Sequence, residues 1–220
     1  MYGYDADMAE GLRERKKRQT RQYISDVATG LFLERGFDAV TVAEIAEAAD
    51  VSVNTVYNYF PAKEDLFLDR SAGVVDRLAR WVRGRGAGES AAAAVLRELR
   101  EEVEAVSPRV GLMSGYAAFM RVIENAPALR SRLWAIGQEV EANLEAALRE
   151  ETGADGDDPM PGLIAGQIGW AHSTVMAVIG REMVKGREPD EVSRETLALL
   201  DDMEELLSDK VLNYAVRDHS

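Results

Sequence analysis

The stretch ADVSVNTVYNYFPAKEDLF, residues 49–67, contains a segment rich in polar and aromatic side chains that has no lysine or arginine before Lys63. A serine, which caps helices well, stands at the start of this segment, and Pro61 ends it. Apolar residues between them recur at the spacing of one helical face, namely Val53, Val56 and Phe60. The opposite face carries Asn54, Thr55, Asn58 and Tyr59. We therefore expect a helix of about two turns with a polar outer face.

Two further helices are expected before this one. From Ile24 to Phe32 the apolar residues follow one helical face, and Gly36 is suited to stop that helix in a left-handed conformation. Thr41 and Glu44 have the spacing of a capping box, which opens a second helix. Asp50 stands at the following bend, and aspartate tolerates a positive φ. A helix, a bend of a few residues and a second short helix with a polar face form a helix-turn-helix, whose second helix enters the major groove of DNA.

Composition excludes several classes of protein. The 220 residues are 46% hydrophobic, enough for a sizeable core, and the absence of cysteine excludes disulfides and thiolate chemistry. The first ten residues lack the apolar run of a secretory signal. The net charge is -13, yet residues 11–24 carry six basic side chains and one acidic, a local charge of +5. A polyanion would meet that patch first, because screening limits electrostatic reach to about 8–10 Å.

Nothing in the chain alternates like a strand, so the fold class predicted is all-α. One helix is expected from Lys63 to Val82, and others over 90–107, 109–125 and 127–152. Glycines mark 83–89 as a loop, and two more loops precede the last two helices. The domains expected are a disordered tail (1–12), a three-helix helix-turn-helix domain (13–62) and a larger helical ligand-binding and dimerisation domain (63–220).

Residues 13–70 resemble the N-terminal domain of the tetracycline-repressor (TetR) family. The likeness rests on many spaced positions, among them the Gly36-Phe37 stop, the Thr41 start, the Val51-Ser52 turn, Tyr57 and Lys63. It covers about a quarter of the chain, and the remainder is similar to the family only in its helical organisation. The resemblance implies a homodimeric, sequence-specific transcriptional repressor that a small apolar or aromatic ligand releases from a palindromic operator.

The resemblance also implies which residues meet DNA. The candidates for base edges are Val53, Asn54, Thr55 and Asn58, and those for phosphates are Thr41, Ser52, Tyr57, Tyr59 and Lys63. An asparagine amide bonds adenine bidentately, valine meets a thymine methyl, and hydroxyls donate to phosphates. The basic run, with Arg18 in it, is expected to reach the backbone or minor groove. Structural alternatives stay open: Tyr57 covers the core, the two hydroxyl residues only cap helices, and the basic run is a solvated helix start.

A dimer surface is expected because symmetric dimers span two half-sites. The uncharged stretch from Pro159 to Gly180 is long enough to cross a membrane, but its polar and glycine residues favour a buried interface helix. The dimer residues predicted are Gly162, Gly166, Gly169, Leu199, Met203, Leu206 and Leu207. The glycines lie in that uncharged stretch, and the other four residues lie in the last helix of the chain. The family resemblance implies that these two helices pack against their copies as a four-helix bundle. The alternative is that the apolar residues of both helices belong to the core of one monomer.

A ligand cavity is implied by the resemblance alone. Its candidate lining is a set of large, adaptable side chains: Met113, Tyr116, Phe119, Met120, Ile123, Trp134, Trp170, His172 and Met176. Each of these has a core residue as its alternative, and His172 is as readily a core histidine with a backbone partner. No cofactor or metal is expected.

Two rival functions remain. An enzyme is disfavoured because the chain has two histidines, no cysteine and no recognisable nucleophile, metal spacing or dinucleotide loop. A helical protein-interaction adaptor, or a small-molecule-binding protein without an operator, is the other alternative, and substitution of Tyr57 or Lys63 would discriminate it. The expected partners are double-stranded DNA, a second copy and an unidentified small-molecule effector, without a membrane, in the cytoplasm.

Overall fold

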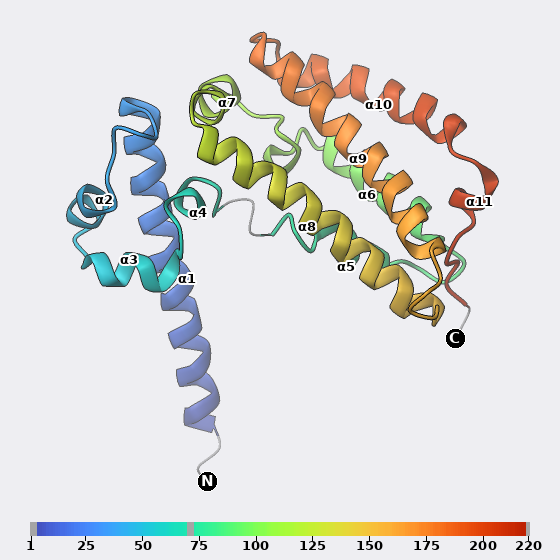
Figure 1. Cartoon of the computed structure of the whole chain (residues 1–220), viewed down its shortest axis with the longest axis horizontal. Helices are drawn as coiled ribbons and strands as arrows, with labels where there is room; N and C mark the ends of the chain where they lie inside the picture. The colour runs from blue at the N-terminus through green and yellow to red at the C-terminus, as the bar shows by residue number, and fades with distance from the viewer. Residues whose placement is uncertain (1–3, 70–72, 219–220) are drawn as a thin grey trace. The chain divides into compact units, whose positions relative to one another are not determined.

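In the computed structural model, which describes residues 4–69 and 73–218, the regular elements are all helices (Figure 1). The all-α prediction is thus confirmed. Contacts divide the chain into two units. The first comprises Met1–Arg70 with Val122–Arg132, and the second comprises Ser71–Arg121 with Leu133–Ser220.

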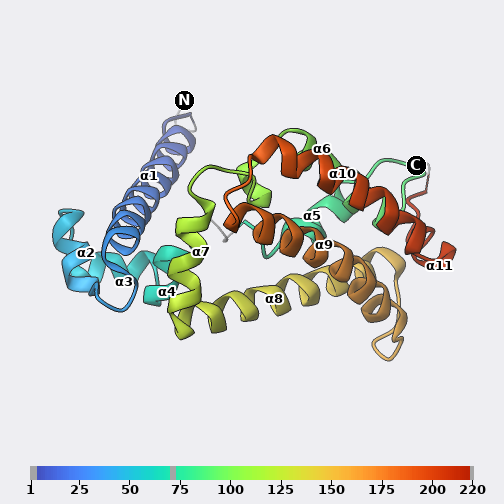
Figure 2. The ribbon, with the colours of Figure 1, turned by 90° about the horizontal axis from the view of Figure 1, so that it is seen from above.

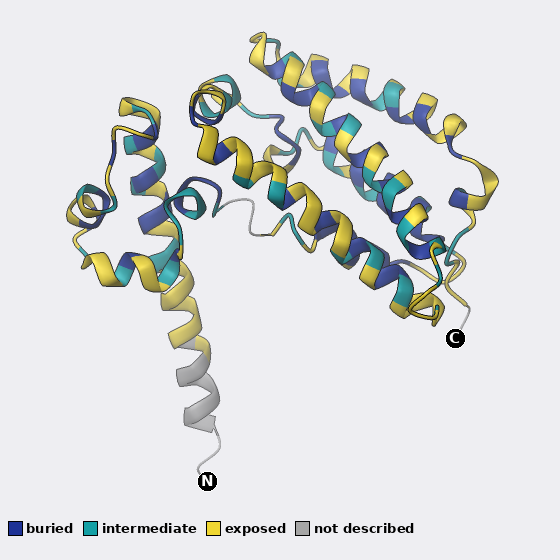
Figure 3. Cartoon of the chain, in the orientation of Figure 1, coloured by how far each residue is buried: buried dark blue, intermediate teal, exposed yellow. Residues whose placement is uncertain are grey.

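The helices that lie entirely in the first unit are α1 (Tyr4–Arg35), α2 (Val42–Ala48), α3 (Val53–Tyr59) and α4 (Lys63–Phe67). α2 and α4 pack against α1, and α3 packs against α2. Their shared core is fully buried and includes Phe32, Ile45, Val56, Phe60 and Phe67. Figure 3 shows buried residues along the C-terminal half of α1, among them Ile24, Ala28 and Phe32. α1 begins at Tyr4, so the tail predicted to be disordered over 1–12 overlaps this helix, and α4 groups with the first unit although a boundary was predicted before Lys63.

The turns and helix caps of this unit are formed by the residues that the sequence predicted. Gly36 has φ 84° and Asp50 has φ 52°, so both adopt the left-handed conformation predicted for them. Thr41 caps α2 in a complete capping box with Glu44, and Ser52 caps α3. α3 ends at Tyr59, two residues before Pro61. The helix-turn-helix geometry was therefore predicted from local signals alone.

Two of the predicted helices are interrupted. The single helix expected from Lys63 to Val82 is divided into α4 and α5 (Arg77–Arg83). α4 is capped by Leu68, whose N–H donates to the carbonyl oxygen of Glu64, and α5 begins only after Asp76. The helix expected over 109–125 is a 3-10 turn, η2 (Pro108–Val110), followed by α7 (Tyr116–Asn125), because glycines with φ near 90° separate them.

The second unit is a bundle of longer helices. It contains α5, α6 (Ala91–Glu104), η2, most of α8 (Pro127–Thr152), α9 (Met160–Val184), α10 (Pro189–Leu206) and α11 (Asp209–Leu212). α9 and α10 run side by side, α6 packs against α10, and α5 packs against α6 (Figures 1 and 2). α7 and α8 each have residues in both units.

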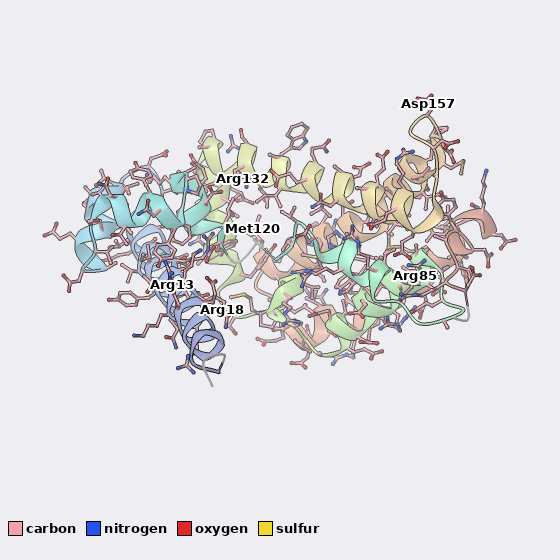
Figure 4. The ribbon with its side chains drawn as sticks, turned by 90° about the horizontal axis from the view of Figure 1, so that it is seen from below. Arg13, Arg18, Arg85, Met120, Arg132 and Asp157 are labelled. Carbon is pink, nitrogen blue, oxygen red and sulfur yellow. The ribbon has the colours of Figure 1, made fainter. Side chains whose placement is uncertain are left out.

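The C-terminal segment closes this bundle through two arginines. Arg85, labelled in Figure 4, is 3% exposed; it pairs with Glu151 at 2.7 Å and donates to the carbonyl oxygens of Val82 and Ala215. Arg217 donates in turn to the carbonyl oxygens of Arg83 and Arg85. Apart from the bond between Arg85 and Val82, these contacts join residues more than 60 positions apart, so helical periodicity could not have predicted them.

Candidate DNA-binding site

The outer face of α3 is a row of exposed polar side chains on a buried apolar base. Val56 and Phe60 are at most 1% exposed and fix the helix to the core. Asn54 and Asn58 are exposed and Thr55 is partly exposed. Val53 was expected on the buried face, but it lies in the first turn and is 39% exposed. α3 thus presents amide, hydroxyl and methyl groups, and no charge, to whatever it contacts.

Both hydroxyl residues predicted to contact phosphates are helix caps. The Ser52 hydroxyl accepts from the backbone N–H of Thr55 at 3.0 Å and lies 2.8 Å from the Thr55 hydroxyl. The Thr41 hydroxyl donates to the Glu44 carboxylate at 2.8 Å. Hydrogen bonds from Arg35 and then from Thr41 lower the pKa of Glu44 to about 2, so this cap stays ionised at neutral pH. Both residues are helix caps, as the sequence predicted, and their contact with DNA stays a prediction.

Lys63 has partners within its own unit. Its ammonium donates to the carbonyl oxygen of Phe37 at 2.6 Å and lies 4.2 Å from the centre of the Phe37 ring. Burial lowers its pKa, against the opposing effect of Asp38 and Glu64. One of its three N–H groups is therefore used to hold the α1–α2 turn, which leaves two for a phosphate.

One arginine of the basic run is structural. Arg21 pairs with Asp69 at 2.7 Å, donates to the carbonyl oxygen of Tyr59, and lies 4.4 Å above the ring of Phe60. It thereby fixes the C-terminal end of α3, a role that the sequence did not indicate because its partners lie 38 and 48 residues away. The other basic residues of the run are exposed on α1, among them Arg13 and Arg18 (Figure 4).

The two tyrosines of α3 differ. Tyr57 is 50% exposed, so its ring is available to a partner. Tyr59 is half-buried, and its carbonyl oxygen is the one that Arg21 holds. The structure therefore brings Ser52, Asn54, Tyr57 and Asn58 together on the outer side of α3.

The residues predicted to line a ligand cavity do not form one group. Trp134 is 71% exposed and Trp170 is 44% exposed, so neither is an interior residue of this chain. Ile123 is buried, but it belongs to the first unit. The remaining residues are buried or half-buried in the second unit: Met113, Tyr116, Phe119, Met120, His172 and Met176.

Some of the predicted dimer residues face the interior of this chain, and others are exposed. Gly162 and Gly166 face α8 within the chain, where the carboxylates of Glu145 and Glu141 lie 3.2 and 3.5 Å from the positions that a Cβ atom would occupy at the two glycines. Met203 and Leu207 are buried in the chain's own core. Gly169 has open space beside it, Leu206 is exposed and Leu199 is partly exposed. An exposed apolar stripe does run along α9 through Leu163, Trp170 and Val184.

α9 is also the one helix, among the residues that the structure describes, with the length and composition of a membrane span. Of its apolar window, 39% is buried inside the protein. Core helices of soluble proteins share this composition, so the feature is weak evidence for a membrane.

Comparison with known proteins places the helix-turn-helix in a family. Residues 24–69 match the family model described as bacterial regulatory proteins, tetR family. The HTH-type transcriptional regulator TcmR of Streptomyces glaucescens is 32% identical over 156 residues, which are 67% of each chain. The transcriptional repressor KstR of Rhodococcus jostii is 33% identical over 69 residues, and that match spans only 32% of KstR.

Solved structures share the fold over nearly the whole chain. The complex of SmeT with triclosan has a TM-score of 0.57 at 19% identity and covers 92% of this chain and 98% of SmeT. NalD of Pseudomonas aeruginosa, a repressor of a multidrug efflux pump, has a TM-score of 0.54 at 19% identity and covers 84% of this chain and 97% of NalD.

The proteins that match in sequence are named as transcriptional regulators, so the prediction that the chain is not an enzyme is confirmed. A curated relative at 32% identity spans two thirds of the chain, and the family match falls on the helices whose geometry was derived above. The chain therefore belongs to the TetR family of DNA-binding transcriptional regulators.

Proposed function

We propose that the protein is a cytoplasmic, homodimeric repressor that reads a palindromic operator through α3 and releases it when a small molecule binds the helical domain. The observation that carries the proposal is the outer face of α3. That face is exposed, polar and uncharged, and it lies on a base fixed by Val56, Phe60 and the Arg21 contacts.

Sequence reading requires rigid donors and acceptors. The amides of Asn54 and Asn58 are four residues apart and so lie on one side of α3, the arrangement needed to meet neighbouring base edges in a major groove. Phosphate contacts would come from the exposed basic side chains of α1 and from Tyr57. We assign sequence specificity to the two asparagine amides, and salt-dependent affinity to the basic side chains of α1 and to Tyr57.

The apolar stripe on α9 supports a dimer. Leu163 is 60% exposed and Trp170 is 44% exposed, and large apolar side chains in a contiguous stripe are typical of protein interfaces. A two-fold dimer would hold two α3 helices at one operator, with half-sites about 34–36 Å apart or a multiple of that distance.

Release by a ligand requires that the ligand prefer one arrangement of the chain. α7 and α8 each contribute residues to both units, so they connect the proposed ligand domain with the DNA-binding unit by continuous helix. A ligand that binds better when α7 is displaced shifts the equilibrium only by its differential affinity for the two states. Relatives of the fold include one solved with triclosan, which motivates a search for aromatic effectors.

The test is selection of random duplex DNA by the purified full chain, with binding measured as a function of salt. We expect a two-fold symmetric motif and an affinity that falls steeply as salt rises. Failure to enrich any sequence at low salt, with the protein shown by refolding to be free of resident ligand, would refute the operator-binding proposal and favour an adaptor.

A further inference from the structure

A buried imidazole in the helical domain has an unused hydrogen-bonding atom. His172 on α9 is 9% exposed, and its Nε2 atom is buried without a hydrogen-bond partner. Burial, and then the positive charge of Arg77, lower the pKa of His172 to about 4. A neutral ring nitrogen left without a partner inside a protein is costly, which is why nearly all such atoms are paired. A ligand atom would satisfy it.

A second polar group, the hydroxyl of the half-buried Tyr116, lies beside α9. The Tyr116 hydroxyl lies 3.1 Å from the position that a Cβ atom of Gly180 would occupy, and the Tyr116 ring lies 2.8 Å from the Cβ position of Gly111. No described residue hydrogen-bonds this hydroxyl, and burial raises its pKa. Both glycines thus make room for the ring.

The spacing of these groups fits a small aromatic molecule. His172, Met176 and Gly180 follow one another at four-residue intervals and so lie along one side of α9. The rise of a helix puts Gly180 about 12 Å from His172, with the half-buried Met176 between them. A two-ring ligand is of about this length, and methionine adapts to the shape of apolar ligands.

The charge near His172 indicates the polarity of such a ligand. The only charged group with a resolved effect on the His172 pKa is Arg77, which is 8% exposed and donates to the carbonyl oxygen of Arg109 at 3.0 Å. Arg77 feels one acidic group, Glu102, and two basic ones, Arg109 and Arg80, and Glu102 already pairs with Arg109 at 3.1 Å. The local balance is positive and favours an anionic or electron-rich group on the ligand.

We propose that His172 and Tyr116 are the polar contacts of an effector site that takes an aromatic molecule bearing an acidic group, a phenol or a carboxylate, with Arg77 providing the compensating charge. This inference rests on the ligand response proposed above and specifies its chemistry. The Nε2–H tautomer of the neutral His172 imidazole donates to the ligand's acidic oxygen, and the apolar body of the ligand covers Met176 toward the Tyr116 hydroxyl.

The test uses three biphenyl probes that differ only in their polar group: biphenyl-4-carboxylate, 4-phenylphenol and 4-methoxybiphenyl. Binding to the full-length dimer is measured by calorimetry, without DNA. We expect the acid and the phenol to bind at least about tenfold more tightly than the ether, the difference that one hydrogen bond to a buried, otherwise unpaired atom provides. Equal affinities, or no measurable binding of any probe, would overturn the proposal.

Two variants separate this site from general damage to the core. His172→Phe and Tyr116→Phe keep apolar volume and remove one polar atom each, so each should reduce the preference for acid over ether while the ether's affinity stays unchanged. Unfolding temperature verifies that each variant is folded. Trp134→Phe is the matched control, since its side chain is exposed and should alter nothing. If neither variant changes the preference, the polar contacts lie elsewhere and the proposal is wrong.

Histidine NMR reports the same contact directly. The chain has two histidines, so isotope-labelled histidine in a His219→Gln background gives one imidazole signal. At saturating probe, the Nε2 resonance should show the shift of a new hydrogen bond with biphenyl-4-carboxylate and a smaller shift, from the aromatic rings alone, with the ether. If the probes bind with this preference but do not release selected operator DNA, the site stands and the proposed inducer response fails. If an operator is found but the probes bind alike, the regulator stands and this site fails.

Discussion

α3 and α9 are the two helices of this protein in which charge is scarcest, yet their exposed faces are opposite in character. α3 has no charged residue, and its exposed side chains include two asparagines and Tyr57. α9 has only Arg181 and Glu182 near its end, and its exposed side chains include Leu163, Trp170 and Val184. The absence of charge on a helix therefore does not by itself identify what the helix binds. The exposed groups indicate the partner: amides and hydroxyls suit base edges, and apolar side chains suit a second copy of the same helix.

The largest effect is expected where a charge enters the apolar stripe of α9. Leu163→Asp should weaken dimerisation by about 3–5 kcal/mol, because an unpaired carboxylate would be buried in the interface. Sedimentation equilibrium measures this, and operator affinity should fall with it. Gln138→Asp on the exposed side of α8 is the control. An unchanged dimer in both variants would mean that the α9 stripe is not the interface.

The buried polar group of α9 should make stability depend on pH. His172 has a folded pKa of about 4 against an ordinary value of 6.5, so the unfolded chain takes up the proton first. The contribution of the neutral His172 to the free energy of unfolding is therefore fully present above pH 6.5. It is lost as the pH falls toward 4, and the loss reaches about 3 kcal/mol. Urea unfolding at several pH values should show this loss in the native chain and a smaller one in His172→Phe. Parallel pH profiles for the two proteins would contradict the burial of a neutral imidazole.

The outer face of α3 should affect sequence preference rather than stability. Asn58→Ala removes an exposed amide, so we expect a loss of about 1–3 kcal/mol on the selected operator and no loss on unrelated DNA. Fluorescence anisotropy with both duplexes measures the difference. Asn213→Ala, also at an exposed asparagine, should leave both affinities unchanged. An equal loss on both duplexes would assign Asn58 to backbone contact instead.

The smallest effect is expected at the basic run of α1. Arg18→Gln should lower the slope of log affinity against log salt by about one and leave the preferred motif unchanged, because a phosphate contact carries no sequence information. Arg21→Gln should differ, since Arg21 holds Asp69, Tyr59 and Phe60 rather than solvent. We expect a lower unfolding temperature for Arg21→Gln only. If the two variants behave alike, the structural role of Arg21 is wrong.

The parts of this fold that were predicted correctly depend on neighbours in sequence. The capping box at Thr41 and the left-handed residues Gly36 and Asp50 involve groups within a few positions, so residue type and spacing suffice to identify them. α8 was likewise predicted with its observed bounds, because Pro127 starts it and Gly153, with φ 61°, follows it.

The parts that were missed depend on distant partners. The basic run that includes Arg21 was predicted to contact DNA or to be a solvated helix start, and Lys63 was predicted to contact a phosphate. Both residues are instead held by groups 26 or more positions away. Trp134 and Trp170 read as interior aromatics, because hydrophobicity alone does not tell a core face from an exposed one. The break between α4 and α5 was also missed, because apolar residues continue at helical spacing across it, through Phe67, Val74 and Leu78.

The measurement that most directly tests the central role of α3 is a comparison of selected DNA motifs between the native chain and Asn54→Ala/Asn58→Ala. Both proteins should enrich two-fold symmetric sites with the same half-site spacing and salt slope, since the dimer and the basic run are unchanged. The variant should lose preference at the base pairs that the two amides contact. An identical motif from both proteins would contradict this role, because it would mean that the outer face of α3 does not read the sequence.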